Sequence, residues 1–272
     1  MRNKAIMLTA LWLCSFLSFV GCTQEQKAVE SDSPAILPIT FVSENFLKQS
    51  PNCKSDSVSC ATVHARYLLV SGGTDSVRQK INNTLMHFLK GSMAVYAVEE
   101  KEYRIPLEQV AERFIADYQS LRKDNPAYDI PWEVETEGTV LFHSSKLVSF
   151  QYSTYSNTGG AHPNSFLTLL VMDKNSGNKL ELSDFITDMP NLKTIAEQYF
   201  RNTHGLSATQ SLDDAGFFWG QSFVLPENYA LTDSGLYFYY NNYEIAPYVV
   251  GPTEFTIPYA DLEGIIIKNK IF

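Results

Sequence analysis

The spacing of apolar residues changes at Pro131, and this change constrains the fold more than any other feature of the sequence. Before Pro131, apolar residues recur every three or four positions, as on the buried face of an α-helix. After it they alternate with polar residues, as on a half-buried β-strand. The resulting order of a strand, two helices and then consecutive strands differs from the regular alternation of a parallel α/β sheet, so it predicts an α+β fold.

A strand and two helices are predicted before the change of spacing. Residues 61–70 are rich in β-forming side chains and end at the breaker at residues 71–73. The first helix follows, with Gly91 as its predicted stop. The second helix opens at Pro106, where a missing N–H is harmless, and ends before Pro126. Their apolar faces comprise Val77, Ile81, Leu85, Phe88 or Leu89, and then Leu107, Val110, Phe114, Tyr118 and Leu121.

An antiparallel meander is predicted after the change of spacing. Residues 166–172 are apolar nearly throughout, so we expect them to lie centrally in the sheet with both faces covered. A third helix is expected between Asp188 and Gly205. The predicted strands are residues 132–142, 148–152, 166–172, 179–182, 223–225, 236–240 and 254–257. We therefore expect an antiparallel meander sheet packed with about three helices, in two linked subdomains.

The amino terminus predicts export. Arg2 and Lys4 precede an apolar run at residues 5–20, which is typical of a secretory signal peptide and too short for a spanning helix. The run closes at residues 19–22, Phe-Val-Gly-Cys, which resemble the bacterial lipobox with phenylalanine in place of the usual leucine. The alternative is an ordinary signal peptide in which Cys22 is incidental.

The lipobox resemblance implies that residues 1–21 are removed and that Cys22 carries lipid. The protein is then exported and lipid-anchored to a bacterial membrane, facing the periplasm or the cell exterior. Residues 22–50 are predicted to form the lipid anchor and a flexible tether. Polar residues and proline dominate this segment until Ile36, so it cannot bury enough apolar surface to fold.

The mature body is acidic. The chain of 272 residues has a formal net charge of −9, and without Arg2 and Lys4 it has 19 Lys+Arg against 30 Asp+Glu, or −11. No basic block occurs in the sequence, which argues against nucleic-acid binding and against electrostatic binding to anionic lipid. The acidity is compatible with a basic protein partner.

Cys53 and Cys60 are predicted to form a disulfide. Cys14 lies in the signal and Cys22 at the lipid site, so two of the four cysteines remain in the body. Outside the cytoplasm such a pair is expected to oxidise, and the small ring contributes about 2.5 kcal/mol in the chain-entropy model. Two cysteines alone make a poor metal site.

Three stretches resemble a known family of extracytoplasmic domains. Residues 155–162 read Tyr-Ser-Asn-Thr-Gly-Gly-Ala-His, residues 180–185 read Leu-Glu-Leu-Ser-Asp-Phe, and residues 235–248 contain Tyr-Glu-Ile-Ala-Pro-Tyr. Together they look like the extracytoplasmic module of the anti-sigma-V factor, the lysozyme-sensing receptor of some Gram-positive bacteria. The upstream half, at roughly residues 53–155, resembles the accessory domain that precedes some peptidoglycan deacetylases.

This resemblance implies a deacetylase-accessory-like subdomain at residues 51–158 and an anti-sigma-V-receptor-like subdomain at residues 159–272. Two features depart from the family. A cleavable signal takes the place of the receptor's cytoplasmic segment and spanning helix, so we expect no sigma factor to be held. The five histidines, never closer than 19 residues, lack the close pair of the deacetylase metal site.

The sequence contains none of the common catalytic or metal-binding motifs. A helical His pair, a Cys-x-x-Cys motif, a phosphate loop and a Gly-x-Ser-x-Gly elbow are all absent. We therefore predict no catalytic residue, no metal ligand and no cofactor. Adjacent carboxylates such as Asp213 and Asp214 more often cap a helix or face solvent.

His162 is a candidate ligand-binding residue because it follows a double glycine in a predicted loop between strands. It could act as a general base or as a donor to a ligand. The favoured interpretation is structural: Gly159 and Gly160 allow an unusual turn, and His162 hydrogen-bonds to hold it.

Aromatic residues supply the other candidates for ligand binding: Tyr155, Phe217, Phe218 and Trp219, with Tyr152, Tyr243 and Tyr248 also near predicted strand ends. Exposed rings stack on sugars and anchor protein interfaces. The alternative is that these rings close the core where helix meets sheet.

Three functions follow as hypotheses. The first is a non-catalytic binding module for a cell-wall glycan or for a wall-targeting protein such as lysozyme, which the resemblance implies. The second is an enzyme that acts on wall polymers, with His162 and a nearby carboxylate transferring protons. The third is a structural envelope protein that acts through protein contacts alone.

Overall fold

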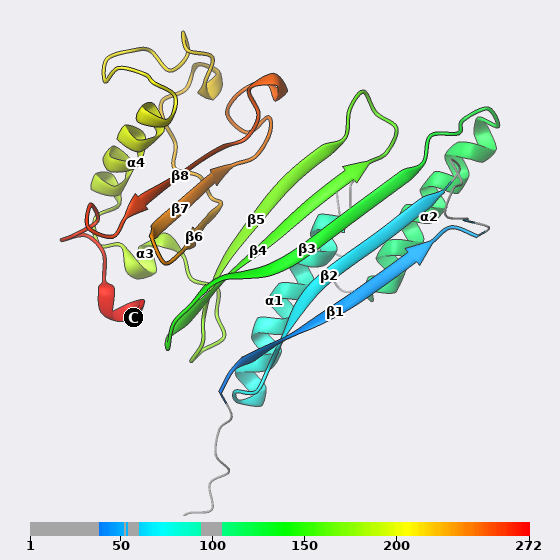
Figure 1. The fold of residues 1–272 in the computed structure, drawn as a ribbon, viewed down its shortest axis with the longest axis horizontal. Coiled ribbons are helices and arrows are strands. Elements are labelled where there is room, and N and C mark those ends of the chain that lie inside the picture. The colour runs from blue at the N-terminus through cyan, green and yellow to red at the C-terminus, as the bar shows by residue number, and fades with distance from the viewer. Residues whose placement is uncertain (1–37, 52, 54–59, 94–104) are drawn as a thin grey trace, which may run out of the picture. The chain divides into compact units, whose positions relative to one another are not determined.

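The structure is a computed structural model that describes residues 38–51, 53, 60–93 and 105–272 (Figure 1). The predicted signal peptide, the predicted lipidation site Cys22 and the first part of the predicted tether lie outside these residues. No helix in the described ranges is both long enough and apolar enough to cross a membrane.

Within the described residues, eight strands form two sheets and are accompanied by four α-helices, which confirms the α+β class. The strands are β1 (Thr40–Gln49), β2 (Ala61–Ser71), β3 (Trp132–His143), β4 (Leu147–Asn157), β5 (Asn164–Asp173), β6 (Tyr229–Leu231), β7 (Gly235–Tyr240) and β8 (Thr253–Pro258). The helices are α1 (Asp75–Met93), α2 (Leu107–Asp124), α3 (Leu182–Phe185) and α4 (Met189–Thr203).

The larger sheet has the strand order β1-β2-β3-β4-β5 (Figure 1). Strands β3, β4 and β5 are successive antiparallel neighbours, as the predicted meander requires. Strands β2 and β3 are parallel. Helices α1 and α2 connect them and bring the chain back to the end of the sheet where β2 begins. Strands β6, β7 and β8 form the smaller, antiparallel sheet.

Strand β1 occupies residues 40–49, where the sequence predicts a flexible tether. It pairs with β2 along its whole length, and Phe41 and Phe46 pack against the core between the sheet and the two long helices. Because β1 is an edge strand, most of its other side chains are exposed and polar. That polarity is why the apolar spacing does not reveal the strand.

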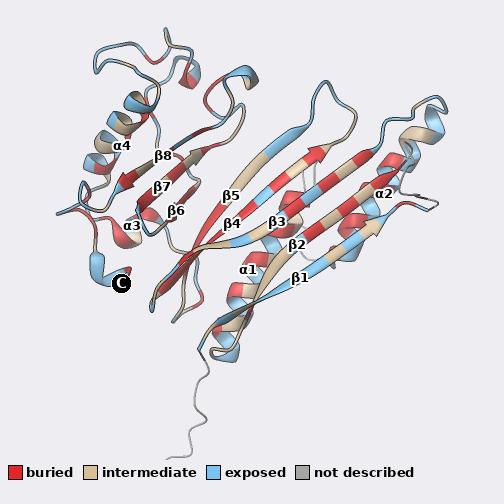
Figure 2. Cartoon of the chain, viewed as in Figure 1, coloured by how far each residue is buried: buried red, intermediate tan, exposed pale blue. Residues whose placement is uncertain are grey.

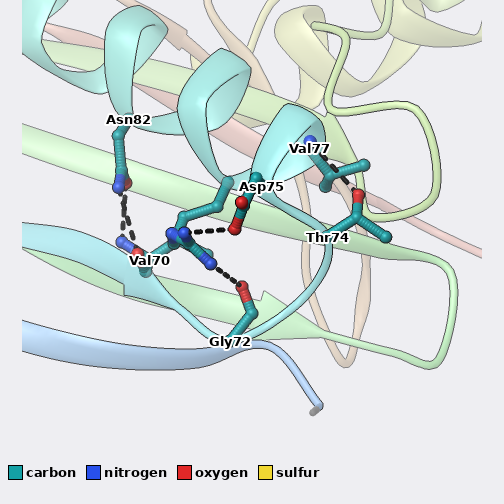
Figure 3. A network of polar contacts seen from close by, with 7 residues as sticks. Val70, Gly72, Thr74, Asp75, Val77 and Asn82 are labelled. Atoms are coloured by element: carbon teal, nitrogen blue, oxygen red, sulfur yellow. Dashed lines mark hydrogen bonds and ion pairs between the residues drawn. The ribbon is translucent and has the colours of Figure 1, made fainter. Parts of the chain in front are cut away.

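The turn from β2 into α1 is fixed by side chains that bond to the backbone (Figure 3). Asn82 accepts a hydrogen bond from the Val70 N–H at 2.7 Å and donates to the Val70 carbonyl at 3.0 Å. Arg78 donates to the Gly72 carbonyl at 3.4 Å and to the Asp75 carboxylate at 2.6 Å. These bonds hold the start of α1 against the end of β2.

Helix α1 continues to Met93, so Gly91 does not end it as predicted. Leu89 and Met93 are buried, and burying such a side chain stabilises by about 1.5–3 kcal/mol. A glycine in a helix costs only about 1 kcal/mol relative to alanine, so packing overrides the local stop signal. Helix α2 begins after Pro106 and ends before Pro126, as predicted.

Strand β5 contains the apolar run that was predicted to lie centrally, but it is an edge strand of its sheet. Both faces of its second half are covered, as predicted, because Leu170 and Met172 point into one core and Val171 into the other. A strand covered on both faces has the same apolar pattern wherever it stands in the sheet, so the sequence does not distinguish edge from centre.

Two asparagines cover the free edge of β5. Asn241 accepts from the Leu167 N–H at 2.7 Å and donates to the Leu167 carbonyl at 3.0 Å. Asn228 accepts from the Leu169 N–H at 2.6 Å and donates to the same Leu167 carbonyl at 2.8 Å. The side-chain amides thus make the hydrogen bonds that a neighbouring strand would make, and they block pairing with another chain at these positions.

The remaining elements follow the prediction in part. Helix α4 and strands β7 and β8 lie where the third helix and two of the later strands are predicted. Residues 179–182 are not a strand, since Lys179 makes an isolated bridge to Met172 and Leu182 begins α3. Residues 223–225 have no regular structure, and β6 has no counterpart in the prediction.

Two hydrophobic cores form, and at β4 and β5 they lie on opposite faces of the larger sheet. Figure 2 shows the buried residues of the chain in red. The N-terminal core packs α1 and α2 against the sheet, and the C-terminal core joins α4 and the smaller sheet to one end of it. Leu147 and Val171 point into the C-terminal core, whereas Val148 and Met172 point into the N-terminal core. Successive residues of β4 and β5 therefore serve both cores. The structure also joins Cys53 to Cys60 by a disulfide.

Candidate functional site

Three aromatic rings stack on the surface of the C-terminal half. His162 lies in the loop between β4 and β5, and Tyr243 and Tyr248 lie in the loop between β7 and β8. The His162 ring centroid is 3.8 Å from that of Tyr248, with 20° between the ring planes, and 6.2 Å from that of Tyr243. We call His162, Tyr243 and Tyr248 the aromatic patch.

The aromatic patch is open to solvent. His162 is exposed, Tyr243 is 54% exposed and Tyr248 is half-buried. Val249, which follows Tyr248, is 91% exposed, so apolar surface continues beyond the rings. A ligand can therefore reach the rings without displacing any part of the described chain.

Hydrogen bonds fix the orientation of the His162 ring. Its Nδ1 lies 2.8 Å from the Pro163 carbonyl oxygen, and because a carbonyl only accepts, Nδ1 carries the proton. In the neutral ring Nε2 then accepts a hydrogen bond from the Tyr243 hydroxyl at 3.2 Å. The Tyr248 hydroxyl donates to the same Pro163 carbonyl at 3.2 Å. The three rings are thus held together before any ligand arrives.

Gly159 sets the path of the loop that carries His162. Its φ of +74° lies in the left-handed region, and a Cβ there would lie 1.8 Å from the Tyr128 hydroxyl oxygen. The Tyr128 hydroxyl donates to the Thr158 carbonyl at 3.4 Å and accepts from the Trp132 indole at 2.9 Å. Gly159 therefore allows an unusual turn, as the structural interpretation of the double glycine predicts. The His162 ring nevertheless remains exposed to solvent.

The loop that carries the two tyrosines is fixed to β5. Besides the bonds of Asn241 to the strand edge, Asn242 donates to the Ser165 carbonyl at 3.3 Å. Tyr243 has a φ of +66°, a conformation that costs about 1–3 kcal/mol for a residue other than glycine. Such strain persists only where the surroundings determine it, so the position of Tyr243 is imposed by the packed loop.

Tyr155 lies beside the aromatic patch. It stands on β4 opposite Glu135 of β3 and is half-buried. Burial raises the pKa of its hydroxyl, and the charge of Glu133 and a hydrogen bond to Glu133 raise this pKa further. Tyr155 also pairs with Ser165 of β5, whose carbonyl accepts a hydrogen bond from Asn242, the residue before Tyr243. Tyr155 therefore lies near the loop that carries the two tyrosines of the patch. The structure therefore brings together two of the predicted candidates, Tyr155 and His162.

A row of carboxylates extends from Tyr155 along β3. Glu133, Glu135 and Glu137 alternate with buried residues, so they point to the face of the sheet opposite the long helices. Glu137 pairs with Arg66 at 2.9 Å. Neither Glu133 nor Glu135 forms an ion pair within the described part of the chain, so an acidic surface adjoins the aromatic patch.

Phe217, Phe218 and Trp219 are not part of the aromatic patch. Phe217 and Phe218 are 6% and 4% exposed and pack against Phe200 in the C-terminal core, which corrects their assignment as ligand-binding residues. Their rings close the core, as the alternative interpretation holds. Trp219 is 56% exposed, but among the described residues it makes no ring contact with the patch.

Tyr243 and Tyr248 were predicted to lie near strand ends but were not among the candidate ligand-binding residues. The string Tyr-Glu-Ile-Ala-Pro-Tyr, which contains both tyrosines at its ends, was the available signal. Their partner His162 lies 81 positions before Tyr243. Contact over such a separation depends on the fold, so spacing along the chain does not reveal it.

The contacts of His162 in the aromatic patch are stacking contacts and hydrogen bonds. His162 bonds to a carbonyl and a hydroxyl, not to a carboxylate that could orient it as a general base. Within the described residues, no group of three or more His, Cys, Asp and Glu side chains is arranged to hold a metal ion. The patch presents flat rings for stacking, with hydroxyl groups and carboxylates at its side.

The patch lies at the end of the larger sheet opposite Thr40. The end of β1 pairs with the start of β2, the start of β2 with that of β3, and the start of β3 with the end of β4. The loop that follows β4 is therefore at the far end from Thr40. The ten residues of β1 span about 33 Å along the strand, so the chain enters the sheet far from the patch.

Two segments of the chain match family models. Residues 53–165 match the model described as "Deacetylase PdaC", and residues 183–260 match the model described as "Protein of unknown function (DUF3298)". The two matches confirm the two-part resemblance found in the sequence. No curated protein matches the chain.

Solved structures of the DUF3298 family are similar to this chain. A member from Bacteroides fragilis has a TM-score of 0.66 at 20% sequence identity, covering 85% of this chain and 94% of its own. A DUF3298 family protein from Pseudomonas aeruginosa PAO1 has a TM-score of 0.57 at 22% identity, covering 86% of this chain and 96% of its own. At these identities the likeness shows the fold alone.

Proposed function

We propose that this protein is an envelope lipoprotein whose aromatic patch binds a cell-wall glycan without cleaving it. The stacking of the exposed rings of His162, Tyr243 and Tyr248 on fixed loops carries the proposal. Aromatic rings offer a flat apolar surface to the faces of sugar rings, with few rotatable bonds to immobilise. Because the rings are already held in place, binding costs little further ordering.

Polar groups beside the rings suit a sugar ligand. The Tyr155 hydroxyl and the carboxylates of Glu133 and Glu135 are within the same region of the surface. Sugar hydroxyl groups both donate and accept hydrogen bonds, so such a mixed border favours a glycan over a purely apolar ligand. The resemblance of the upstream half to a domain that accompanies peptidoglycan deacetylases supports a ligand from the cell wall.

The proposed anchor is consistent with this placement. Lipid on Cys22 would hold the chain by the segment that enters the sheet at Thr40, and the patch is at the opposite end. A flexible tether between Cys22 and Thr40 would leave the patch free to reach wall polymer. The intervening residues of the tether add to this reach.

Replacing Tyr248 tests the proposal, since its ring stacks on His162 at 3.8 Å. We expect Tyr248→Ala to lower binding to purified peptidoglycan and to N-acetylglucosamine oligosaccharides at least about tenfold, which equals a loss of about 1.4 kcal/mol. The matched control is Tyr199→Ala, which removes a partly exposed tyrosine from α4 and should leave binding unchanged. The proposal fails if the wild type binds neither material, or if a folded Tyr248→Ala variant binds as the wild type does.

A basic wall-targeting protein such as lysozyme is the second candidate ligand. The row formed by Glu133, Glu135 and Glu137 favours it, together with the charge of −11 on the mature body. Binding of this kind should weaken with salt, because the attraction is between exposed charges. Capture of lysozyme at low salt that is lost in Glu133→Gln/Glu135→Gln would support this candidate. Capture that survives both the substitutions and 0.5 M salt would exclude the electrostatic mechanism.

A further inference from the structure

A separate pocket lies at the C-terminal end of α2. It has a volume of about 380 Å³, and its polar lining comes from Ser50, Tyr118, Gln119, Arg122 and Lys123, with two prolines completing the wall. It shares no lining residue with the aromatic patch.

The guanidinium group of Arg122 is held in place in this pocket. Its Cζ lies 5.9 Å from the centroid of the Tyr118 ring, and its Nε donates to the Tyr128 carbonyl at 3.2 Å. These contacts leave the two terminal nitrogens available, because Arg122 forms no ion pair with a carboxylate of the described chain. A fixed guanidinium with a free edge is suited to a planar, two-oxygen acceptor.

The Tyr118 hydroxyl also lacks a partner. Tyr118 is 1% exposed and lines the pocket, yet no group in the described residues meets hydrogen-bond geometry with its hydroxyl. Burial raises the pKa of this hydroxyl, and the Arg122 guanidinium offsets part of the rise through its charge and by directing a donor toward the hydroxyl oxygen. The hydroxyl hydrogen itself has no acceptor among the described residues. A buried polar group left unsatisfied costs about 1–3 kcal/mol, so a ligand oxygen at this position would be stabilising.

We propose that this pocket binds a carboxylate, such as the carboxyl terminus of a short peptide. The carboxylate oxygens accept from the free edge of Arg122 and from the Tyr118 hydroxyl, and Lys123 adds a second positive charge at the rim. The prolines and the stem of Gln119 contact the rest of the ligand.

The pocket favours a monoanion over phosphate. Asp124 follows Lys123 in the chain, and Asp129 is close enough to affect the Tyr118 hydroxyl. The carbonyl groups at the end of α2 also carry partial negative charge. For a phosphate dianion the attraction to the two cations and the repulsion by these groups both double, so neither separates the two ligands. The cost of removing the ion from water rises roughly as the square of its charge, and this cost favours the carboxylate.

The test uses the full mature chain and two probes that differ only in the carboxylate: N-acetyl-dialanine and its C-terminal amide. We expect titration followed by NMR to show that the acid perturbs the signals of Tyr118 and Arg122 and that the amide binds at least about tenfold more weakly. Equal binding of acid and amide, or no binding of the acid, would overturn the proposal. Tighter binding of inorganic phosphate than of the acid would overturn the assignment to a carboxylate.

Variants locate the effect. Arg122→Gln should lower affinity for the acid at least about tenfold, and Arg122→Lys should restore part of it, because the charge returns without the two-donor edge. Lys123→Gln changes an exposed residue, so it provides a second test if Arg122→Gln does not fold. This variant should lower the affinity for the acid about threefold. Lys193→Gln, the matched loss of one charge on exposed α4, should change nothing. Unchanged affinity in both pocket variants would exclude this pocket.

Discussion

Two aromatic clusters in the C-terminal half use the same residue types in opposite ways. One cluster is buried around Phe200, whose ring centroid lies 5.1 Å from those of Phe217 and Phe218. The other is the aromatic patch, where rings stack at the surface. The contrast shows that an aromatic run in the sequence does not identify a binding site. What the run does depends on whether other elements cover it.

Each cluster contains one histidine, and the two differ in their surroundings. His204 ends α4 with its ring 4.7 Å from that of Phe200 and 4.4 Å from that of Phe217, and its Nε2 is 3.1 Å from the Thr253 hydroxyl. Burial lowers the pKa of His204 below its usual value. At this helix end, loss of solvent therefore outweighs the attraction of the negative helix terminus for a cation.

The largest expected effect is on the buried cluster. Phe200 is fully buried, so Phe200→Ala should lower the free energy of unfolding by about 3–5 kcal/mol through lost burial and the cavity left behind. Urea denaturation measures this change. Tyr243→Ala, a similar truncation in the patch, should cost less than about 1 kcal/mol, because the tyrosine side chain is exposed and alanine keeps the same backbone conformation. Equal losses in the two variants would remove the distinction between the clusters.

A smaller effect is expected where the chain positions the patch. Gly159→Ala should lower the free energy of unfolding by about 1–3 kcal/mol, since its Cβ meets the Tyr128 hydroxyl and its φ is positive. Binding of N-acetylglucosamine oligosaccharides should fall with it as the His162 loop shifts. Gly160→Ala is the matched control, because the nearest atom to its Cβ is 3.9 Å away. A binding loss as large in Gly160→Ala would show that the site responds to any change in the loop.

The half-buried His204 makes stability depend on pH. Because the folded-state pKa of His204 is lowered, the unfolded state binds more protons once the pH falls below about 6.5. The contribution of His204 is therefore fully present above that pH and is lost as the pH falls toward the folded-state pKa. Thermal unfolding at pH 7.5 and pH 5 should show a smaller decrease in His204→Gln than in the wild type. The same decrease in both proteins would mean that His204 is not the responsible group.

The smallest effect on stability is expected for Tyr248→Ala. The ring is half-buried and packs on other surface rings, so its loss should cost about 1 kcal/mol or less, while glycan binding falls. Unfolding and binding measured on the same preparation separate the two. A loss of several kcal/mol would place Tyr248 among the structural rings.

Local signals predicted much of the fold. Helix α2 begins and ends beside its prolines, and β3 to β5 follow the alternation of apolar residues. Strand β1 was not predicted, because an edge strand with one solvated face carries few apolar residues. The position of β5 at the sheet edge was not predicted, because the groups that cover this edge are the side chains of Asn228 and Asn241, which come from distant loops.

The candidate site was less predictable than the fold. His162 was selected from its double glycine and belongs to the patch, and Tyr155 was selected from its strand end and lies beside the patch. Phe217 and Phe218 had the same aromatic character but belong to the core. Exposure is a property of the assembled fold, so the sequence supplies the residue types and only tertiary packing decides which rings reach solvent.

NMR mapping of a bound glycan tests whether the aromatic patch is the binding site. An N-acetylglucosamine oligosaccharide is titrated into the protein while the aromatic side-chain signals are recorded. We expect saturable shifts of His162, Tyr243 and Tyr248, with the signals of Phe217 and Phe218 unchanged. Saturable shifts confined to other residues, or none at the patch, would contradict it.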